Sequence, residues 1–260
     1  MILTSPGAEA FSIFGLTVYR YGIIMAFAIL IGAYAADWAY RKYFLVNENN
    51  DLLLDLMPWL IVVGFAGARI YYCILNYHYY LARPLSILNV REGGLSIHGT
   101  LLACIIFLIV YAKKKGIKLF NLTAPLVLGL ALAQSIGRWG NFFNTEAFGK
   151  PLESGFIKLF IPEALRPLQY RQFEYFHPAF LYESILDFGI FLILLLAVKK
   201  KKNSLFITSL YFALYALVRI LVESIRVDSI ANFYGIPVAV IVSVIILIAA
   251  LWGIFQSRLD

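Results

Sequence analysis

Long apolar stretches alternate with short polar connections along most of this chain. Several stretches reach the roughly 17 to 25 residues that a helix needs to cross a hydrocarbon core. Because backbone polar groups inside a bilayer must be satisfied internally, the pattern predicts a bundle of membrane-spanning helices. We predict seven spans, at about residues 18–38, 56–76, 97–112, 122–142, 178–198, 204–222 and 236–256.

The composition agrees with a membrane protein. The 260 residues are 62% hydrophobic, 16% aromatic and only 14% charged, and the mean hydropathy is +0.80, which no ordinary soluble domain has. The first basic residue is Arg20, which follows Pro6 and Glu9, so we expect no cleavable signal peptide. The net charge of +7 is attributed to cytoplasmic loops and contact with the lipid bilayer rather than to nucleic acid.

The distribution of lysine and arginine predicts the orientation. Basic clusters follow the first, third and fifth spans, all on one side, and they consist of Arg41, Lys42, Lys113, Lys114, Lys115, Lys118 and the lysines at 199–202. By the positive-inside rule this side is cytoplasmic, so we expect the N-terminus outside and the C-terminus in the cytoplasm.

The expected fold is thus an all-α polytopic membrane protein with about seven transmembrane helices, forming a single domain over residues 1–260. The longest polar interruption, residues 143–176, contains Pro151, Pro162 and Pro167 and lies outside in this topology. We interpret it as a small extracytoplasmic cap inserted between spans four and five.

Polar residues within the spans are predicted to gather near the outer membrane face. Spans one, three and five run inward, and spans two, four and six run outward. With about 1.5 Å of rise per residue, residues at the starts of the inward spans therefore lie at the same depth as residues at the ends of the outward spans. These residues are Tyr21, His98, His177, Glu183, Arg69, Asn76, Arg138, Asn141, Arg219 and Glu223. Snorkelling of single arginines, or a structural Arg–Glu pair, is the alternative to a cavity that binds an anion.

The end of span six carries a charged stripe. Arg219, Glu223 and Arg226 are spaced i, i+4 and i+7, which places them within roughly 60° on one helix face. Because a charge in hydrocarbon costs several kcal/mol, the stripe should face a polar cavity or a partner charge. Arginine suits bidentate phosphate contacts, so we expect a phosphate site in the outer leaflet.

The densest motif covers residues 137–149 and reads G-R-W-G-N-F-F-N-T-E-A-F-G. Capping of a helix C-terminus by Gly and Asn would explain most of it, but such a cap does not need an intramembrane arginine. The segment resembles the signature of prolipoprotein diacylglyceryl transferases. Further blocks resemble the family in the same order: Tyr21-Gly22, Gly67-Ala68-Arg69-Ile70, G-G-L-S-I-H-G at 93–99, H-P-A-F-L-Y-E at 177–183 and R-I-L-V-E-S-I-R at 219–226.

The resemblance implies a transferase of the bacterial plasma (inner) membrane, with its active site toward the outer leaflet. It would move the sn-1,2-diacylglyceryl group from phosphatidylglycerol to the lipobox cysteine thiol of a preprolipoprotein signal peptide, forming a thioether and releasing glycerol phosphate. This is the first step of bacterial lipoprotein maturation. We expect a monomer that needs no cofactor.

Roles for individual residues follow from this chemistry. Charge develops on the departing phosphate oxygen, so cations should stabilise it, and Arg138 and Arg219 are the candidates. A thiol with a pKa of about 8.5 is mostly protonated at neutral pH, so a nearby base would help it to react. The candidate base is His98, which begins span three, where the helix dipole disfavours the imidazolium and keeps the ring able to accept a proton. The alternative is a hydrogen-bonded histidine at the membrane interface. We expect the phospholipid to be bound by Arg138, Asn141, Asn144, Glu146, Gly149, Tyr21 and Arg69. Supporting roles are expected of His177, Tyr182, Glu183, Glu223 and Arg226.

Neither the cysteines nor other ligand residues indicate a metal site. Cys73 and Cys104 lie in apolar stretches and are read as packing residues, and no cluster offers paired metal ligands, so we predict no metal requirement. An anion or lipid transporter with an intramembrane Arg/Glu site would place its charges near the midplane of two related halves. A non-catalytic lipid-binding scaffold is the third possibility.

Overall fold

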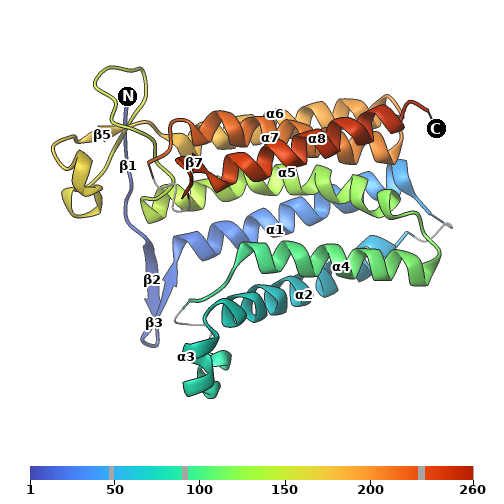
Figure 1. The fold of residues 1–260 in the computed structure, drawn as a ribbon, viewed down its shortest axis with the longest axis horizontal. Helices are drawn as coiled ribbons and strands as arrows, with labels where there is room; N and C mark the ends of the chain where they lie inside the picture. Colours follow the sequence, from blue (N-terminus) through green and yellow to red (C-terminus); the bar gives the residue numbers. More distant parts are fainter. Residues whose placement is uncertain (47–49, 90–92, 228–231, 260) are drawn as a thin grey trace. The chain divides into compact units, whose positions relative to one another are not determined.

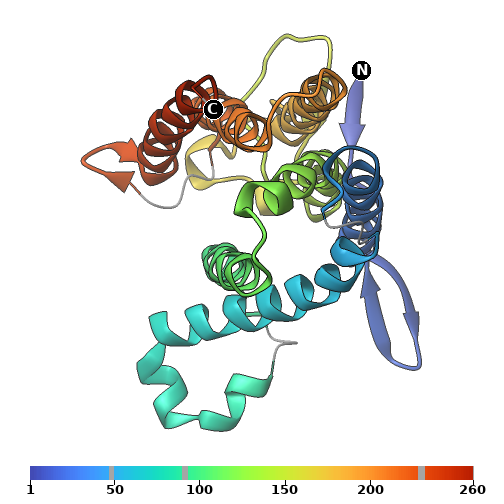
Figure 2. The same cartoon turned by 90° about the vertical axis from the view of Figure 1, so that its right-hand side faces the viewer.

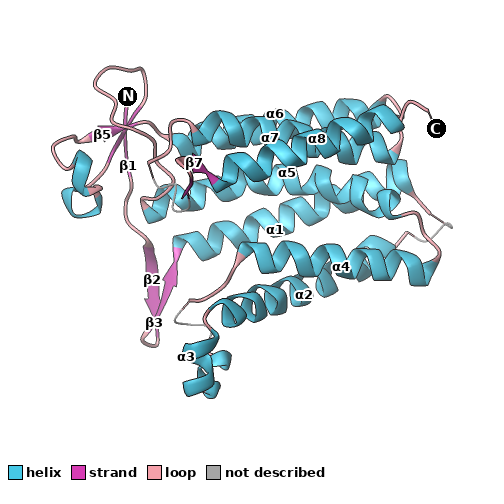
Figure 3. Cartoon of the chain, viewed as in Figure 1, coloured by secondary structure: helices cyan, strands magenta, loops and turns pink. Residues whose placement is uncertain are grey.

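A computed structural model describes residues 1–46, 50–89, 93–227 and 232–259 (Figure 1). In these residues seven helices are long and apolar enough to cross a membrane, which confirms the predicted all-α polytopic class. They are α1 (Arg20–Ala39), α2 (Leu52–Leu75), α4 (Ile97–Lys115), α5 (Leu119–Asn144), α6 (Ala179–Lys199), α7 (Ser204–Glu223) and α8 (Val238–Gln256). Figure 3 shows that helix dominates, with strands confined to short segments.

The chain divides into two compact units. The first consists of Met1–Ala39 and Ala124–Asp260, and the second of Tyr40–Thr123. The helix that begins with α1 continues across this division as a π-helical turn, η1 (Tyr40–Phe44).

In the first unit the helices pack side by side as antiparallel neighbours. Figure 2 looks along them and shows α7 between α6 and α8, in agreement with the contacts between these elements. Helices α1 and α5 cross closely at Gly32 and Gly129, where a Cβ on Gly32 would lie 2.7 Å from the Gly129 carbonyl oxygen. Glycine is therefore required at this crossing because no side chain fits between the backbones.

The cap of the first unit is built on a three-stranded sheet. Strand β1 (Ile2–Thr4) pairs in parallel with β4 (Lys158–Phe160), which pairs antiparallel with β5 (Tyr175–Phe176). Two 3₁₀ turns, η3 (Glu163–Leu165) and η4 (Leu168–Tyr170), connect β4 to β5. Phe148, Leu159, Ile161, Phe176 and Phe180 form its buried core, so the cap is anchored to the start of α6. The sequence did not predict that the N-terminal strand completes this sheet.

Two short hairpins complete the first unit. Strands β2 (Glu9–Ile13) and β3 (Leu16–Tyr19) are joined at Phe14 and Gly15, which both have positive φ values, of 51° and 77°. Positive φ at both turn residues is what a tight two-residue hairpin requires. The second hairpin pairs β6 (Asn232–Phe233) with β7 (Ile236–Pro237) just before α8.

The second unit is a pair of helices with a bent extension. Helices α2 and α4 cross at Gly67 and Gly99, since a Cβ on Gly67 would lie 2.6 Å from the Gly99 carbonyl oxygen. Beyond α2, the chain turns through α3 (Tyr77–Ala82) and η2 (Pro84–Leu88) before it enters α4. Sequence patterning predicted the two spans but not this extension.

Candidate functional site

The arginines and acids of the first unit that the sequence singled out meet at the end of the helices that carries the cap. Helices α5 and α7 end there and α6 begins there, as Figure 1 shows. Arg138 lies in the last two turns of α5, Arg219 in the last turns of α7, and Glu183 near the start of α6. The end of α6 with its lysines and the C-terminus lie at the opposite end of this unit.

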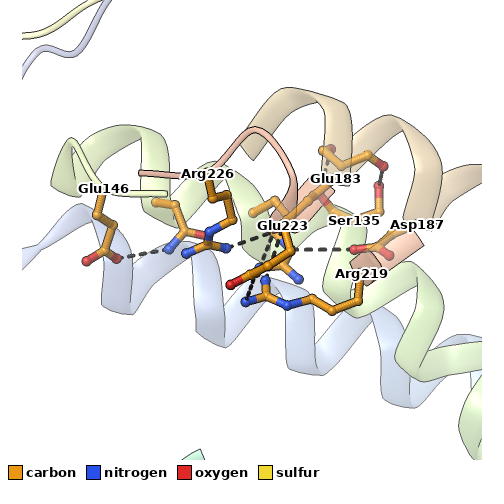
Figure 4. Close-up of polar contacts among 10 residues, drawn as sticks. Ser135, Glu146, Glu183, Asp187, Arg219, Glu223 and Arg226 are labelled. Atoms are coloured by element: carbon orange, nitrogen blue, oxygen red, sulfur yellow. Dashed lines mark hydrogen bonds and ion pairs between the residues drawn. The ribbon is translucent and has the colours of Figure 1, made fainter. Parts of the chain in front are cut away.

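Glu183 is the centre of a buried cluster of charges (Figure 4). Its Oε2 lies 2.6 Å from Nη1 of Arg138, and its Oε1 lies 3.3 Å from Nη1 of both Arg219 and Arg226. One carboxylate therefore binds three guanidinium groups from separate segments. The predicted convergence of Arg138 and Arg219 is present in the structure.

Two further carboxylates complete the cluster. Asp187 Oδ2 lies 3.5 Å from Nε of Arg138, and Glu223 Oε2 lies 2.7 Å from Nη2 of Arg219. The latter is the i, i+4 pair that the spacing on span six predicted. Three guanidinium groups thus face three carboxylates, and this balance makes the burial of so many charges tolerable.

Exposure differs between the acids and the bases of this cluster. The side chains of Glu183, Asp187 and Glu223 are at most 3% exposed, whereas those of Arg138 and Arg219 are 20% and 22% exposed. The carboxylates therefore lie behind the guanidinium groups, and the accessible part of the cluster is cationic. Such an arrangement suits an anionic ligand, because the donors are held in place before it arrives.

The predicted position of Arg226 on a helical stripe is wrong. Helix α7 ends at Glu223, and Arg226 instead forms an isolated β-bridge with Gly149 of the cap. Its side chain reaches Glu183 from this bridge and not from the helix face. The short turn at residues 224–225 breaks the helical spacing on which the prediction depended.

Gly149 lies where three backbone segments meet. Its N–H donates to the carbonyl of His177 at 2.8 Å, and the next N–H, of Lys150, donates to the carbonyl of Ile225 at 2.8 Å. A Cβ on Gly149 would lie 2.8 Å from the Cβ of His177 and 3.0 Å from the Ile225 oxygen. This glycine therefore permits the approach that brings Arg226 to the cluster.

The end of α5 is organised by Glu146. The side-chain amides of Asn141 and Asn144 donate to its Oε1 at 2.9 and 3.3 Å. Thr145 and Ala147 have positive φ values of 56° and 55°, so the chain bends sharply on both sides of this glutamate. In the view of Figure 4, Glu146 and Asp187 lie at opposite ends of the drawn side chains.

The remaining predicted residues of the first unit lie beside the same helices. The ring of Tyr21, on α1, lies against Gly140 of α5, where a Cβ would come within 2.8 Å of it. His177 and Tyr182 form a hydrogen bond between Nδ1 and the hydroxyl at 3.2 Å. Among the described residues neither side chain of this pair forms an ion pair, and the backbone of His177 is hydrogen-bonded to Gly149 and Lys150 of the cap.

His98 and Arg69 belong to the second unit. His98 is exposed, lies in the first turn of α4 as predicted, and its ring centroid is 6.3 Å from that of Tyr71. Arg69 is buried and donates five hydrogen bonds of 2.6 to 3.0 Å to backbone carbonyls. The acceptors are the carbonyls of Ser86, Ile87, Asn89, Gly93 and Gly94. Because a guanidinium group has five N–H donors, these bonds account for all of them and give Arg69 a structural role in this loop.

The sequence reasoning missed Asp187 and the polar contacts next to it. Ser135 and Ser184 exchange hydrogen bonds, each hydroxyl donating to the other's backbone carbonyl at 2.9 and 2.7 Å, and Tyr211 donates to Gln134 at 2.8 Å. An acid inside an apolar span is a signal in its own right. Asp187 is also four residues from Glu183, which places both on one face of α6.

Known proteins are similar in sequence to this chain over most of its length. The model of a family described as prolipoprotein diacylglyceryl transferase matches residues 8–256. A phosphatidylglycerol–prolipoprotein diacylglyceryl transferase of a Synechococcus species is 42% identical over 235 residues, which cover 88% of this chain and 82% of that protein. Its counterpart from a Synechocystis species is 37% identical over 256 residues, 96% of this chain and 89% of that protein.

Proposed function

Because the chain belongs to the prolipoprotein diacylglyceryl transferase family and is a transferase, we propose that it modifies the lipobox cysteine of preprolipoproteins. The donor is phosphatidylglycerol, from which the sn-1,2-diacylglyceryl group is taken. The product is a lipoprotein precursor with a thioether, and glycerol phosphate is released. The names of the relatives identify the same two substrates.

The observation that carries the proposal is the set of guanidinium groups around Glu183. Arg138, Arg219 and Arg226 come from different segments and are all partly exposed, whereas the carboxylate that they share is buried. Planar guanidinium groups match the geometry of phosphate oxygens. Arg138 and Arg219 are therefore assigned to the lipid phosphate, while Arg226, Glu183 and Glu223 support them.

The negative charge that develops during the reaction falls on the phosphate group that these cations are proposed to bind. The cysteine sulfur attacks the glyceryl carbon next to the phosphate, the S–C bond forms as the C–O bond breaks, and the electron pair of that bond remains on the phosphate oxygen. Stabilising this oxygen with preorganised cations in a site with little water lowers the barrier. The thiol proton goes to a base, for which His98 is the candidate, and the protonated base can then return it to solvent.

The end of α5 is proposed to bind the glycerol headgroup. Asn141 and Asn144 already hold Glu146 through their amides, which leaves a row of fixed polar groups beside the arginines. Tyr21 packs against the same helix and borders this row. Because Gly149 has no side chain, the neighbouring backbone segments can approach each other closely. His177 and Tyr182 support the cap from the start of α6.

The enzyme is a multi-pass membrane protein, and we assign it to the bacterial plasma membrane. The site is assigned to the outer leaflet, with the N-terminus outside, because the basic clusters predict that the opposite ends of the helices are cytoplasmic. We propose that the enzyme acts as a monomer. A transporter is disfavoured because the charges of the cluster, apart from Asp187 in α6, gather toward one end of the helices.

The test is a reaction with defined components. Purified protein in vesicles that contain phosphatidylglycerol is incubated with a lipobox peptide, and the peptide is analysed by mass spectrometry. A mass increase equal to one diacylglyceryl group, resistant to hydroxylamine as a thioether is, supports the proposal. A peptide with Ser in place of the lipobox Cys is the control, and an unmodified Cys peptide would refute the proposed activity.

A further inference from the structure

Asp187 is a buried acid that the proposed chemistry does not use. Asp187 is 1% exposed, and its Oδ1 has no hydrogen-bond partner among the residues that the structure describes. Its Oδ2 forms an ion pair with Nε of Arg138 at 3.5 Å. A buried carboxylate with incomplete hydrogen bonding is costly, so a position that served packing alone would be better filled by an uncharged side chain.

Arg138 lies between two carboxylates of the same helix. Glu183 contacts its terminal Nη1 and Asp187 contacts its Nε, and the two acids are one helical turn apart on α6. Nε, the guanidinium nitrogen nearer the backbone, faces Asp187 and the terminal Nη1 faces Glu183, so the guanidinium group lies between the two acids. Contacts on two different nitrogens define the plane of the guanidinium group, which a single contact does not.

The helices themselves are locked next to this contact. Ser135 on α5 and Ser184 on α6 each precede their charged residue by three positions and exchange two hydrogen bonds. Figure 4 shows Ser135 near Asp187. Since the backbones are held, the orientation of the Arg138 head depends on its two carboxylates. Glu183 is shared among three guanidinium groups, so the second contact is specific to Arg138.

We propose that Asp187 is a positioning residue for the transfer reaction, which fixes the guanidinium plane of Arg138 against the phosphate of the donor lipid. This inference depends on the proposed function. Without the charge of Asp187 the lipid would still bind, because Arg138 remains a cation. The departing oxygen would be stabilised less well, because the donors would no longer be aligned with it.

The test compares Asp187→Asn, which keeps the shape and removes the charge, with Asp187→Glu, which keeps the charge and moves it. Asp55→Asn is the matched control, since Asp55 is an exposed acid on α2. Turnover of the lipobox peptide is measured per folded molecule, with the folded fraction taken from size-exclusion chromatography. We expect kcat to fall about 10- to 100-fold for Asp187→Asn with KM for phosphatidylglycerol within about threefold. Asp187→Glu should fall between Asp187→Asn and the wild type, and the control should be unchanged.

Other results would overturn the proposal. Wild-type kcat per folded molecule in Asp187→Asn, or in Asp187→Glu if the Asn variant does not fold, would mean that Asp187 has no part in orienting Arg138. A raised KM for phosphatidylglycerol with unchanged kcat would assign Asp187 to lipid binding instead. An inactive wild-type protein would refute the proposed function itself, which is a different outcome from an active wild type with a normal Asp187→Asn variant.

Discussion

Replacing Gly149 by alanine tests whether the cap positions Arg226. The added Cβ would lie 2.8 Å from the Cβ of His177 and 3.0 Å from the carbonyl oxygen of Ile225. Carbon atoms in contact are normally about 3.5 to 4.0 Å apart, so one of the segments must move by roughly 1 Å. Neither can do so freely, because Gly149 and Lys150 are hydrogen-bonded to both.

Both the stability and the turnover of the Gly149→Ala variant should fall. Overpacking of this kind costs about 1 to 3 kcal/mol, which should lower the thermal midpoint of the purified protein. Arg226 is bridged to Gly149, so the shift moves its head away from Glu183. A displacement of about 1 Å in a catalytic site costs on the order of 100-fold in rate. We therefore expect a loss of turnover of about 10- to 100-fold in the lipobox peptide assay.

Gly189→Ala is the matched control for this change. Gly189 lies inside α6, and a Cβ there would meet no atom within 4 Å. Alanine favours a helix by about 1 kcal/mol over glycine, so this variant should keep its turnover, and its midpoint should not fall. If Gly149→Ala retains the wild-type values of both, the close approach of the three segments has no importance for the site and the reasoning is wrong.

Three further changes test the other assignments. Arg138→Lys keeps the charge but loses the planar fork, and turnover should fall about 100- to 1,000-fold while the protein still inserts; unchanged turnover would remove Arg138 from the mechanism. His98→Gln should lower turnover across pH 6 to 8, because the thiol proton then has no side-chain acceptor; near-normal turnover across that interval would exclude His98 as the base. Arg69→Lys can replace at most three of five hydrogen bonds, so we expect faster proteolysis in the 83–94 loop, and an unchanged cleavage rate would contradict the structural role.

Much of the architecture could be predicted because it depends on local properties of the chain. A hydrocarbon layer requires long apolar helices, and the predicted spans agree with the seven observed helices to within a few residues at most of their ends. The pairing of Arg219 with Glu223 also followed from spacing within one helix. The extension after α2 and the strand β1 were not predicted, because their partners lie far away in the sequence or in irregular segments.

That arginines and acids occupy the same ends of several spans could be read from the chain alone, and its motifs identified the family to which those spans belong. The folded protein was needed to show that Glu183 binds three of the arginines, that Asp187 contacts Arg138, and that Arg69 donates its hydrogen bonds to nearby backbone carbonyls. Hydropathy sets the depth of a residue along a helix, whereas the partner of its side chain depends on how each helix is rotated about its axis, and the packing of side chains between helices sets that rotation.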